Sequence, residues 1–332
     1  MSLSPCLSSR VRIARNYEDL PFDLSAKPEL AEECLNRTAG ALAASGCDSG
    51  FLLHRMSDLT EGHRALLAES QYISRSLAKA EGAGAVLLNE RDGLSIMVCE
   101  EDHLRIQAIQ PHLNLNEAAE ACFRIEEALS RQVRFAFDSE LGYLTACPSN
   151  TGTGLRASVL LHLPMVTTRD KAGDVTEMAA RFGLSIRGVF GKGRMALGDV
   201  YMLSNHVRLG RTEEELVSAV LAVAHDLTDL ENALMEESRR AERVSLENRV
   251  YRAWALLRSA RILSESEFYS LWSSARLGLA LGWIDADADT LDSLLWDTLP
   301  QHLVSWRETA LDEQQLGEAR AERVRSAVGR LF

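Results

Sequence analysis

The sequence predicts an α+β protein: a largely antiparallel sheet flanked by helices, followed by an α-helical C-terminal domain. Short apolar runs with strand-like composition are confined to the first two-thirds of the chain. Two of these runs are separated by Asp92-Gly93, a dipeptide typical of hairpin turns. From residue 211 onward the apolar residues recur with helical spacing instead. For a chain of 332 residues we therefore expect two domains, residues 1–210 and residues 211–332.

The first region alternates between helical and extended segments. Pro28 opens and Gly46 closes a helix predicted over residues 28–45, and further helices are predicted over residues 60–81 and 115–131. The strand candidates are shorter apolar runs. They cover residues 84–90, 94–100, 104–109, 133–137, 155–163, 184–190 and 199–203.

The second region is predicted to be helical throughout. Thr212 and Glu215 have the spacing of a capping box and open a helix over residues 212–235. A second helix is predicted over residues 246–263, and a third begins at Ser264 and ends at Gly282. The polar face of the 212–235 helix is acidic, so we interpret its apolar face as core or as a homodimer seam rather than as a membrane binder.

Composition excludes several functional classes. The 36 Lys and Arg residues are outnumbered by 48 Asp and Glu residues, which gives a net charge of -12 and argues against a nucleic-acid partner. The six cysteines include no C-x-x-C pair, so neither a disulfide framework nor a zinc site is predicted. No apolar run reaches the roughly 18 residues that span a bilayer, and the first residues carry no apolar signal segment. We therefore expect a cytoplasmic protein with no membrane partner.

Four segments concentrate arginine, glutamate, glycine and asparagine. They are SSRVRIARN (8–16), CEEDHLRIQ (99–107), ACPSNTGTGLRAS (146–158) and IRGVFGKGR (186–194). Any one of them fits a solvated loop with an arginine at a strand end. Several converging guanidinium groups, however, offer the bidentate donors that suit a nucleotide polyphosphate. Together the four segments predict an anion site.

These segments resemble the signature blocks of the phosphagen (ATP:guanidino) kinases, most closely those of the bacterial protein arginine kinases. The resemblance continues through DVYMLSNHVRLGRTEEE (199–215) and into the helical region, through LENRVYRAWALLRSARILSESEF (246–268) and ARLGLALGWI (275–284). It implies an antiparallel sheet with flanking helices and an added helical domain. It also implies an ATP-dependent phosphotransferase that acts on guanidino groups, and specifically a protein arginine kinase that phosphorylates Arg side chains in proteins.

The resemblance implies a complete nucleotide site. Its arginines would surround the phosphates of ATP together with Mg2+, with no metal ligand contributed by the protein. The matching arginines are Arg10, Arg12, Arg105, Arg156 and Arg187. The same blocks add Ser8, Ser9, Val11, Ala157, Ser158 and Val159 to the ATP-binding residues.

The acceptor side departs from the family pattern. By resemblance, Glu101 holds the acceptor guanidinium and removes its proton, and Cys147 contacts the same group. A second glutamate should follow Arg187 by five residues, but that position is Lys192. A cation there would repel the guanidinium. The alternative is therefore a catalytically impaired relative that binds ATP and acts as a regulatory or scaffolding protein.

Further departures concern other positions. Cys99 stands where the block usually has Asn, and Gln71 stands where a His usually lies in the nucleotide site. Leu316-Gly317 replaces the Arg-Asp of a phosphoarginine-binding motif, although Arg320 is retained. By resemblance, the partners are protein substrates with exposed Arg, an adaptor protein and a Clp-type protease system.

Overall fold

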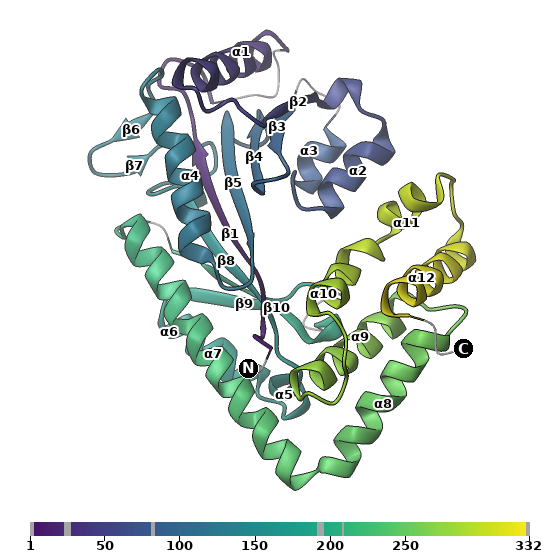
Figure 1. Cartoon of the computed structure of the whole chain (residues 1–332). Coiled ribbons are helices and arrows are strands. Elements are labelled where there is room, and N and C mark those ends of the chain that lie inside the picture. The colour runs from purple at the N-terminus through teal and green to yellow at the C-terminus, as the bar shows by residue number, and fades with distance from the viewer. Residues whose placement is uncertain (1–2, 23–27, 81–83, 191–195, 208, 330–332) are drawn as a thin grey trace. The chain divides into compact units, whose positions relative to one another are not determined.

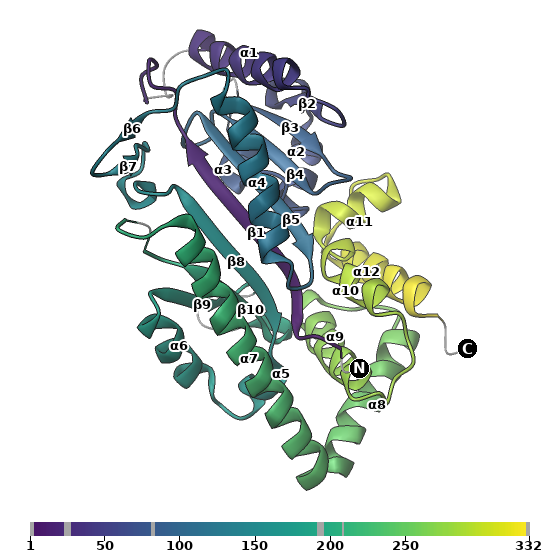
Figure 2. The same ribbon diagram turned by 60° about the vertical axis from the view of Figure 1, so that its left-hand side comes forward.

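The computed structural model describes residues 3–22, 28–80, 84–190, 196–207 and 209–329 (Figures 1 and 2). The chain forms two compact units. A strand-rich unit comprises Ser8–Val159 and Ser204–Leu221, and a helix-rich unit comprises Met1–Leu7, Leu160–Leu203 and Ala222–Phe332. Each unit uses segments distant in sequence, and the division into residues 1–210 and 211–332 stays a prediction.

The predicted α+β class with a mainly antiparallel sheet is confirmed. The strands follow the order β2-β3-β4-β5-β1-β8-β10-β9, and β6 pairs with β7 in a separate hairpin. The strands are β1 (Cys6–Arg15), β2 (Leu52–Arg55), β3 (Ala85–Asn89), β4 (Leu94–Val98), β5 (Leu104–Pro111), β6 (Phe137–Asp138), β7 (Gly142–Tyr143), β8 (Leu155–His162), β9 (Leu184–Gly188) and β10 (Val200–Asn205).

The predicted hairpin turn joins β3 to β4. Gly93 has φ of 65°, and a Cβ at this position would lie 2.2 Å from the carbonyl oxygen of Ile109. Both the backbone conformation and the close approach therefore require glycine. The predicted strand over 133–137 is wrong: Phe135 makes an isolated bridge to Tyr17, and regular pairing begins only at β6.

Among the residues described, the helices of the strand-rich unit are α1 (Pro28–Ser45), α2 (Glu61–Glu69), α3 (Arg75–Lys79), α4 (Leu115–Ser130) and the start of α7 (Glu213–Ala241). Helix α4 lies along β5 and β1 in both views (Figures 1 and 2). On β1 the odd-numbered residues Val11, Ile13 and Arg15 are fully buried, whereas Arg10 and Arg12 are half-buried. Because side chains alternate along a strand, Arg10 and Arg12 lie on the face opposite α4.

The helix-rich unit is built around aromatic residues of α9, including Phe268, Tyr269 and Trp272. Its helices are α5 (Pro164–Thr168), α6 (Ala172–Arg181), most of α7 (Glu213–Ala241), α8 (Arg243–Ser259), α9 (Glu265–Ala280), α10 (Ala288–Asp297), α11 (Pro300–Arg307) and α12 (Glu313–Val328). The predicted capping box at the start of α7 is confirmed, because Thr212 and Glu215 each donate a backbone N–H to the other's side chain. Within the described residues, none of the helices is both long and apolar enough to cross a membrane.

Candidate active site

Three adjacent strands bring four of the predicted arginines to one face of the sheet. Arg10 and Arg12 are on β1, Arg105 is on β5, and Arg156 is on β8. The β1–β5 register pairs Ala14 with Arg105, which places Arg105 diagonally beside Arg12. On the other side, the Ala14 N–H donates to the Gly154 carbonyl at 3.1 Å, and the Ser158 hydroxyl donates to the Arg10 carbonyl at 3.3 Å. These two bonds place Arg156 beside Arg12.

Arg12 lies among like charges, with Glu100 as a nearby counter-charge. Burial lowers the pKa of Arg12 well below its ordinary value, and repulsion from Arg10, Arg105 and Arg156 lowers it further. Arginine side chains stay protonated in folded proteins. The cluster therefore presents concentrated positive charge in a partly desolvated place, where an anion is bound strongly.

Neighbouring side chains orient these arginines. Arg10 donates to the side-chain oxygen of Gln71 at 2.9 Å, and Arg156 donates to the Ser204 hydroxyl at 3.2 Å. The side-chain amide of Gln107 donates to the backbone carbonyl oxygen of Gln71 at 2.8 Å and so holds Gln71 in place. Thus the glutamine at the position of the family histidine belongs to the cluster and positions Arg10.

Gln71 and Cys99, two of the positions that depart from the family pattern, share a backbone feature. Their φ angles are 64° and 57°, in the left-handed region that non-glycine residues seldom adopt. Asparagine tolerates this region better than cysteine. The cysteine at 99 therefore carries more backbone strain than the usual asparagine would, immediately before the acidic pair Glu100-Glu101.

Glu100 is a site residue that the sequence analysis missed. Its carboxylate lies 2.7 Å from Nη1 of Arg105, and its side chain is only 4% exposed. Burial acts to raise the pKa of Glu100, but attraction to Arg105 and hydrogen bonds from Ser74 and Ser76 outweigh it, so the pKa is lowered. The sequence signal that could have identified Glu100 was its position next to Glu101 in the same segment. Glu100 therefore fixes Arg105 and leaves Glu101 more exposed.

Glu101 lies beside the loop that joins β7 to β8 and carries Cys147 (residues 144–154, the Cys147 loop). The Glu101 carboxylate accepts from Arg105 Nη2 at 3.1 Å and from the Asn150 side chain at 3.3 Å. Asn150 ends the short 3-10 turn that begins directly after Cys147. The Cys147 sulfur lies 3.0 Å from the Ser149 hydroxyl. Glu101 is 43% exposed, so its second carboxylate edge is accessible to a ligand.

Asp102, also missed from the sequence, joins the two acceptor segments. It is buried, and its Oδ1 accepts from the Asn16 amide at 2.8 Å and from the Ala146 N–H at 2.7 Å. Ala146 directly precedes Cys147. Asp102 therefore fixes the position of the Cys147 loop relative to Glu101, which makes it a positioning residue.

His103 has a structural role. Its Nδ1 accepts from the Tyr17 N–H at 3.0 Å, so Nε2 carries the proton and donates to the Pro21 carbonyl at 3.0 Å. Burial lowers the pKa of His103, which favours the neutral ring. Both ring nitrogens are engaged within the fold.

The remaining predicted residues fall into three groups. Six of them lie in β1 and β8, the strands that carry the arginines: Ser9, Val11, Ala157, Ser158 and Val159, which are buried, and Ser8, which is half-buried. Their role in binding ATP stays a prediction. Arg187 is exposed on β9 in the helix-rich unit. Lys192 lies outside the described residues.

The position of the phosphoarginine-binding motif is filled by packing. Arg320 is buried, and its guanidinium donates to the carbonyl oxygens of Thr298 and Leu263 at 3.2 and 2.9 Å. A Cβ at Gly317 would lie 3.0 Å from the Ile262 side chain. Arg320 is therefore engaged in hydrogen bonds within the fold.

The described part of the chain holds no group of three His, Cys, Asp or Glu side chains that could bind a metal ion.

Comparisons with known proteins agree with this geometry. The family model for the ATP:guanido phosphotransferase C-terminal catalytic domain matches residues 33–234, and the model for the protein-arginine kinase McsB C-terminal domain matches residues 243–331. A protein-arginine kinase from Caldanaerobacter subterraneus subsp. tengcongensis is 36% identical over 320 residues, which covers 96% of this chain and 95% of that protein. One from Symbiobacterium thermophilum is 41% identical over 279 residues, covering 83% and 79%.

Solved structures show the same fold. A lombricine kinase superposes with a TM-score of 0.62 at 27% identity, covering 70% of this chain and 67% of that one. A duplicated taurocyamine kinase from Schistosoma mansoni with bound transition state analog components gives a TM-score of 0.64 at 26% identity, covering 76% of this chain and 36% of that one.

Proposed function

We propose residue roles for a chain that belongs to the ATP:guanido phosphotransferase family and, within it, to the protein-arginine kinases. The chain is an enzyme that transfers a phosphoryl group from ATP to arginine side chains in proteins. The observation that supports the assignment of its site is the convergence of Arg10, Arg12, Arg105 and Arg156 on three adjacent strands.

These four arginines bind the phosphates of ATP. As the γ-phosphoryl group moves, its charge spreads over the equatorial oxygens, and fixed guanidinium groups stabilise that charge without reorganising. Arg187 is the fifth member of the set by resemblance. Mg2+ bound with the nucleotide would neutralise phosphate charge.

On the acceptor side, Glu101 orients the substrate guanidinium and receives its proton. The attacking nitrogen forms a bond to the γ-phosphorus while the bond from phosphorus to the bridging oxygen of ADP breaks, and the N–H proton passes to the Glu101 carboxylate. The substrate replaces the contacts that Glu101 makes to Arg105 and Asn150. Cys147 fixes the other side of the cationic acceptor.

Lys192 is the observation behind the alternative of a catalytically impaired relative. The test incubates labelled ATP and an arginine-rich protein with wild type, Glu101→Gln or Lys192→Glu. Lys171→Glu is the matched charge control. We expect acid-labile phosphate on arginine for wild type, a loss of about 10²- to 10⁴-fold in Glu101→Gln, and a gain of about tenfold in Lys192→Glu.

Several outcomes would overturn these roles. Full activity in Glu101→Gln would remove Glu101 as proton acceptor. A loss of activity in Lys192→Glu would mean that Lys192 contributes to the reaction. An inactive wild type that still binds ATP would favour the regulatory alternative.

The adaptor and the protease system rest on the resemblance, the homodimer on the apolar face of the 212–235 helix, and the location on the composition of the chain. We extend the proposal to an adaptor protein, a Clp-type protease system, a homodimer through the helical region and a cytoplasmic location. Light scattering during size-exclusion chromatography tests the dimer, and a monomer at micromolar concentration would contradict it.

A further inference from the structure

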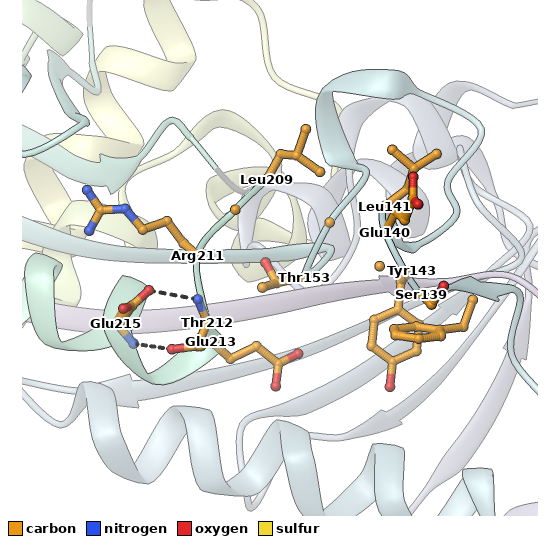
Figure 3. Close-up of a pocket in the computed structure, with 14 residues that line it drawn as sticks. Ser139, Glu140, Leu141, Tyr143, Thr153, Leu209, Arg211, Thr212, Glu213 and Glu215 are labelled. Carbon is orange, nitrogen blue, oxygen red and sulfur yellow. Dashed lines mark hydrogen bonds between the residues drawn. The ribbon is translucent and has the colours of Figure 1, made fainter.

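A cavity of about 560 Å³ opens in the strand-rich unit, and the proposed chemistry does not use it. Three segments line it: the β6–β7 hairpin, Gly152 and Thr153 at the end of the Cys147 loop, and residues 209–215 at the start of α7 (Figure 3). The hairpin is joined to the loop, because Tyr143 and Gly152 exchange backbone hydrogen bonds of 2.8 and 3.3 Å. The cavity is therefore coupled to the segment that carries Cys147.

Arg15 fixes the wall of the cavity from beneath. It is fully buried, its guanidinium lies 3.4 Å from the centre of the Tyr143 ring, and it pairs with Glu213 at 3.1 Å and with Glu126 at 2.6 Å. It also donates to the Thr153 carbonyl at 2.8 Å. One guanidinium thus faces two carboxylates, so negative charge remains on this wall.

The lining combines negative charge with exposed apolar side chains. Glu140, Glu213 and Glu215 outnumber Arg211, whose side chain points away from the hairpin, whereas the Glu213 carboxylate points toward Tyr143 (Figure 3). The Glu215 carboxylate caps α7.

Large apolar groups surround these charges: Phe137, Leu141 and Leu209 are 61%, 47% and 53% exposed. Such a surface complements a peptide that presents a cationic side chain beside an apolar one.

The cavity lies within reach of the proposed acceptor position. Gly152 follows Cys147 by five residues, so the two are separated by at most about 17 Å. An extended peptide of about five or six residues could span that distance.

We propose that this cavity binds the segment of the protein substrate that flanks the acceptor arginine, and that it takes a basic residue next to an apolar one. The inference rests on the proposed function, because Cys147 marks the acceptor position. A minimal arginine acceptor would not reach the cavity, whereas a polypeptide would.

Glu140→Lys tests the charged contact, and Leu141→Ser tests the apolar one. Glu120→Lys, an exposed residue of α4 outside the cavity, is the matched control. Acceptors are a ten-residue peptide with one arginine and a Lys-Leu flank, the same peptide with a Ser-Ser flank, and N-acetylarginine amide. Binding of a fluorescent Lys-Leu peptide is measured in parallel by anisotropy, with lysine in place of the acceptor arginine.

For Glu140→Lys we expect KM for the Lys-Leu peptide to rise about five- to tenfold, with kcat and the KM for ATP unchanged within twofold. Leu141→Ser should raise the same KM about two- to fourfold. The Ser-Ser peptide and the minimal acceptor should respond to neither change. Anisotropy should show the same ranking of affinities.

Equal effects on all acceptors, the same loss in Glu120→Lys, or no effect in either cavity variant would overturn the proposal. Failure of the proposed function can be distinguished from failure of the cavity proposal. In that case no peptide is phosphorylated, and anisotropy alone decides: binding weakened by Glu140→Lys supports the cavity, and absent or unchanged binding refutes it.

Discussion

Arg12 and Arg15 lie three residues apart on β1, and their surroundings differ in one decisive respect. Around Arg15, the fold supplies two carboxylates, two carbonyl oxygens and an aromatic face, and the side chain is fully buried. Around Arg12, the fold supplies three further arginines, with Glu100 as a partial counter-charge. Arg15 is thus a balanced charge that stabilises the fold. Arg12 lies among like charges whose repulsion a bound polyphosphate would relieve.

Substitution of Arg15 tests the contribution of its paired charge to stability. Arg15→Met leaves Glu126 and Glu213 without their cation, so the free energy of unfolding should fall by about 3–5 kcal/mol. Arg15→Lys keeps the charge but loses the bidentate geometry, so its free energy of unfolding should lie between those of Arg15→Met and wild type. Urea unfolding measures both. Wild-type stability in Arg15→Met would show that the carboxylates do not depend on this arginine.

A buried carboxyl group in the helix-rich unit offers a second test of how the fold treats a buried charge. Glu231 is 3% exposed and accepts the backbone N–H groups of Met165 and Val166 at 2.8 and 3.0 Å. Burial raises its pKa to about 7, whereas an unfolded chain has an ordinary glutamate pKa of about 4.3.

Because the folded pKa is the higher one, this contribution to stability is full below about pH 4 and is lost as pH rises through 7. The free energy of unfolding should therefore fall by about 3 kcal/mol from this group between pH 4.5 and 8. Glu231→Gln should flatten that slope in urea titrations at several pH values. An identical slope in the variant would assign the pH dependence to other groups.

The third prediction removes one member of the unbalanced cluster. Arg156→Ala should weaken Mg–ATP binding by about 1.5–3 kcal/mol, because a charge-assisted contact to phosphate is lost. Arg91→Ala, on the exposed β3–β4 turn, is the control and should bind ATP like wild type. Isothermal titration calorimetry gives both values. Equal dissociation constants for Arg156→Ala and Arg91→Ala would remove Arg156 from the nucleotide site.

The fold was largely predictable because local signals agree with tertiary structure. The helix over 28–45, the hairpin at Gly93 and the capping box at Thr212 all follow from short-range chemistry. The strand expected over 133–137 failed because pairing partners, rather than apolar composition, decide whether such a run becomes a strand.

The site was predictable only in part. The helix expected over 60–81 is interrupted between α2 and α3, where Gln71 adopts a positive φ and accepts from Arg10. No short-range pattern shows that contact. Glu100 and Asp102 were missed for a similar reason: their roles depend on Arg105 and Ala146, which only the folded chain brings to them.

We expect bound nucleotide to relieve the repulsion that acts on Arg12. The measurement is the free energy of urea unfolding of wild type and Arg12→Gln, each with and without saturating Mg–ATP. Wild type should gain about 2.7 kcal/mol at a nucleotide concentration 100 times its Kd. Arg12→Gln should be at least as stable as wild type without nucleotide, since repulsion is relieved, and should gain much less with it. A variant that is destabilised without nucleotide and still gains the full wild-type increment would contradict the account.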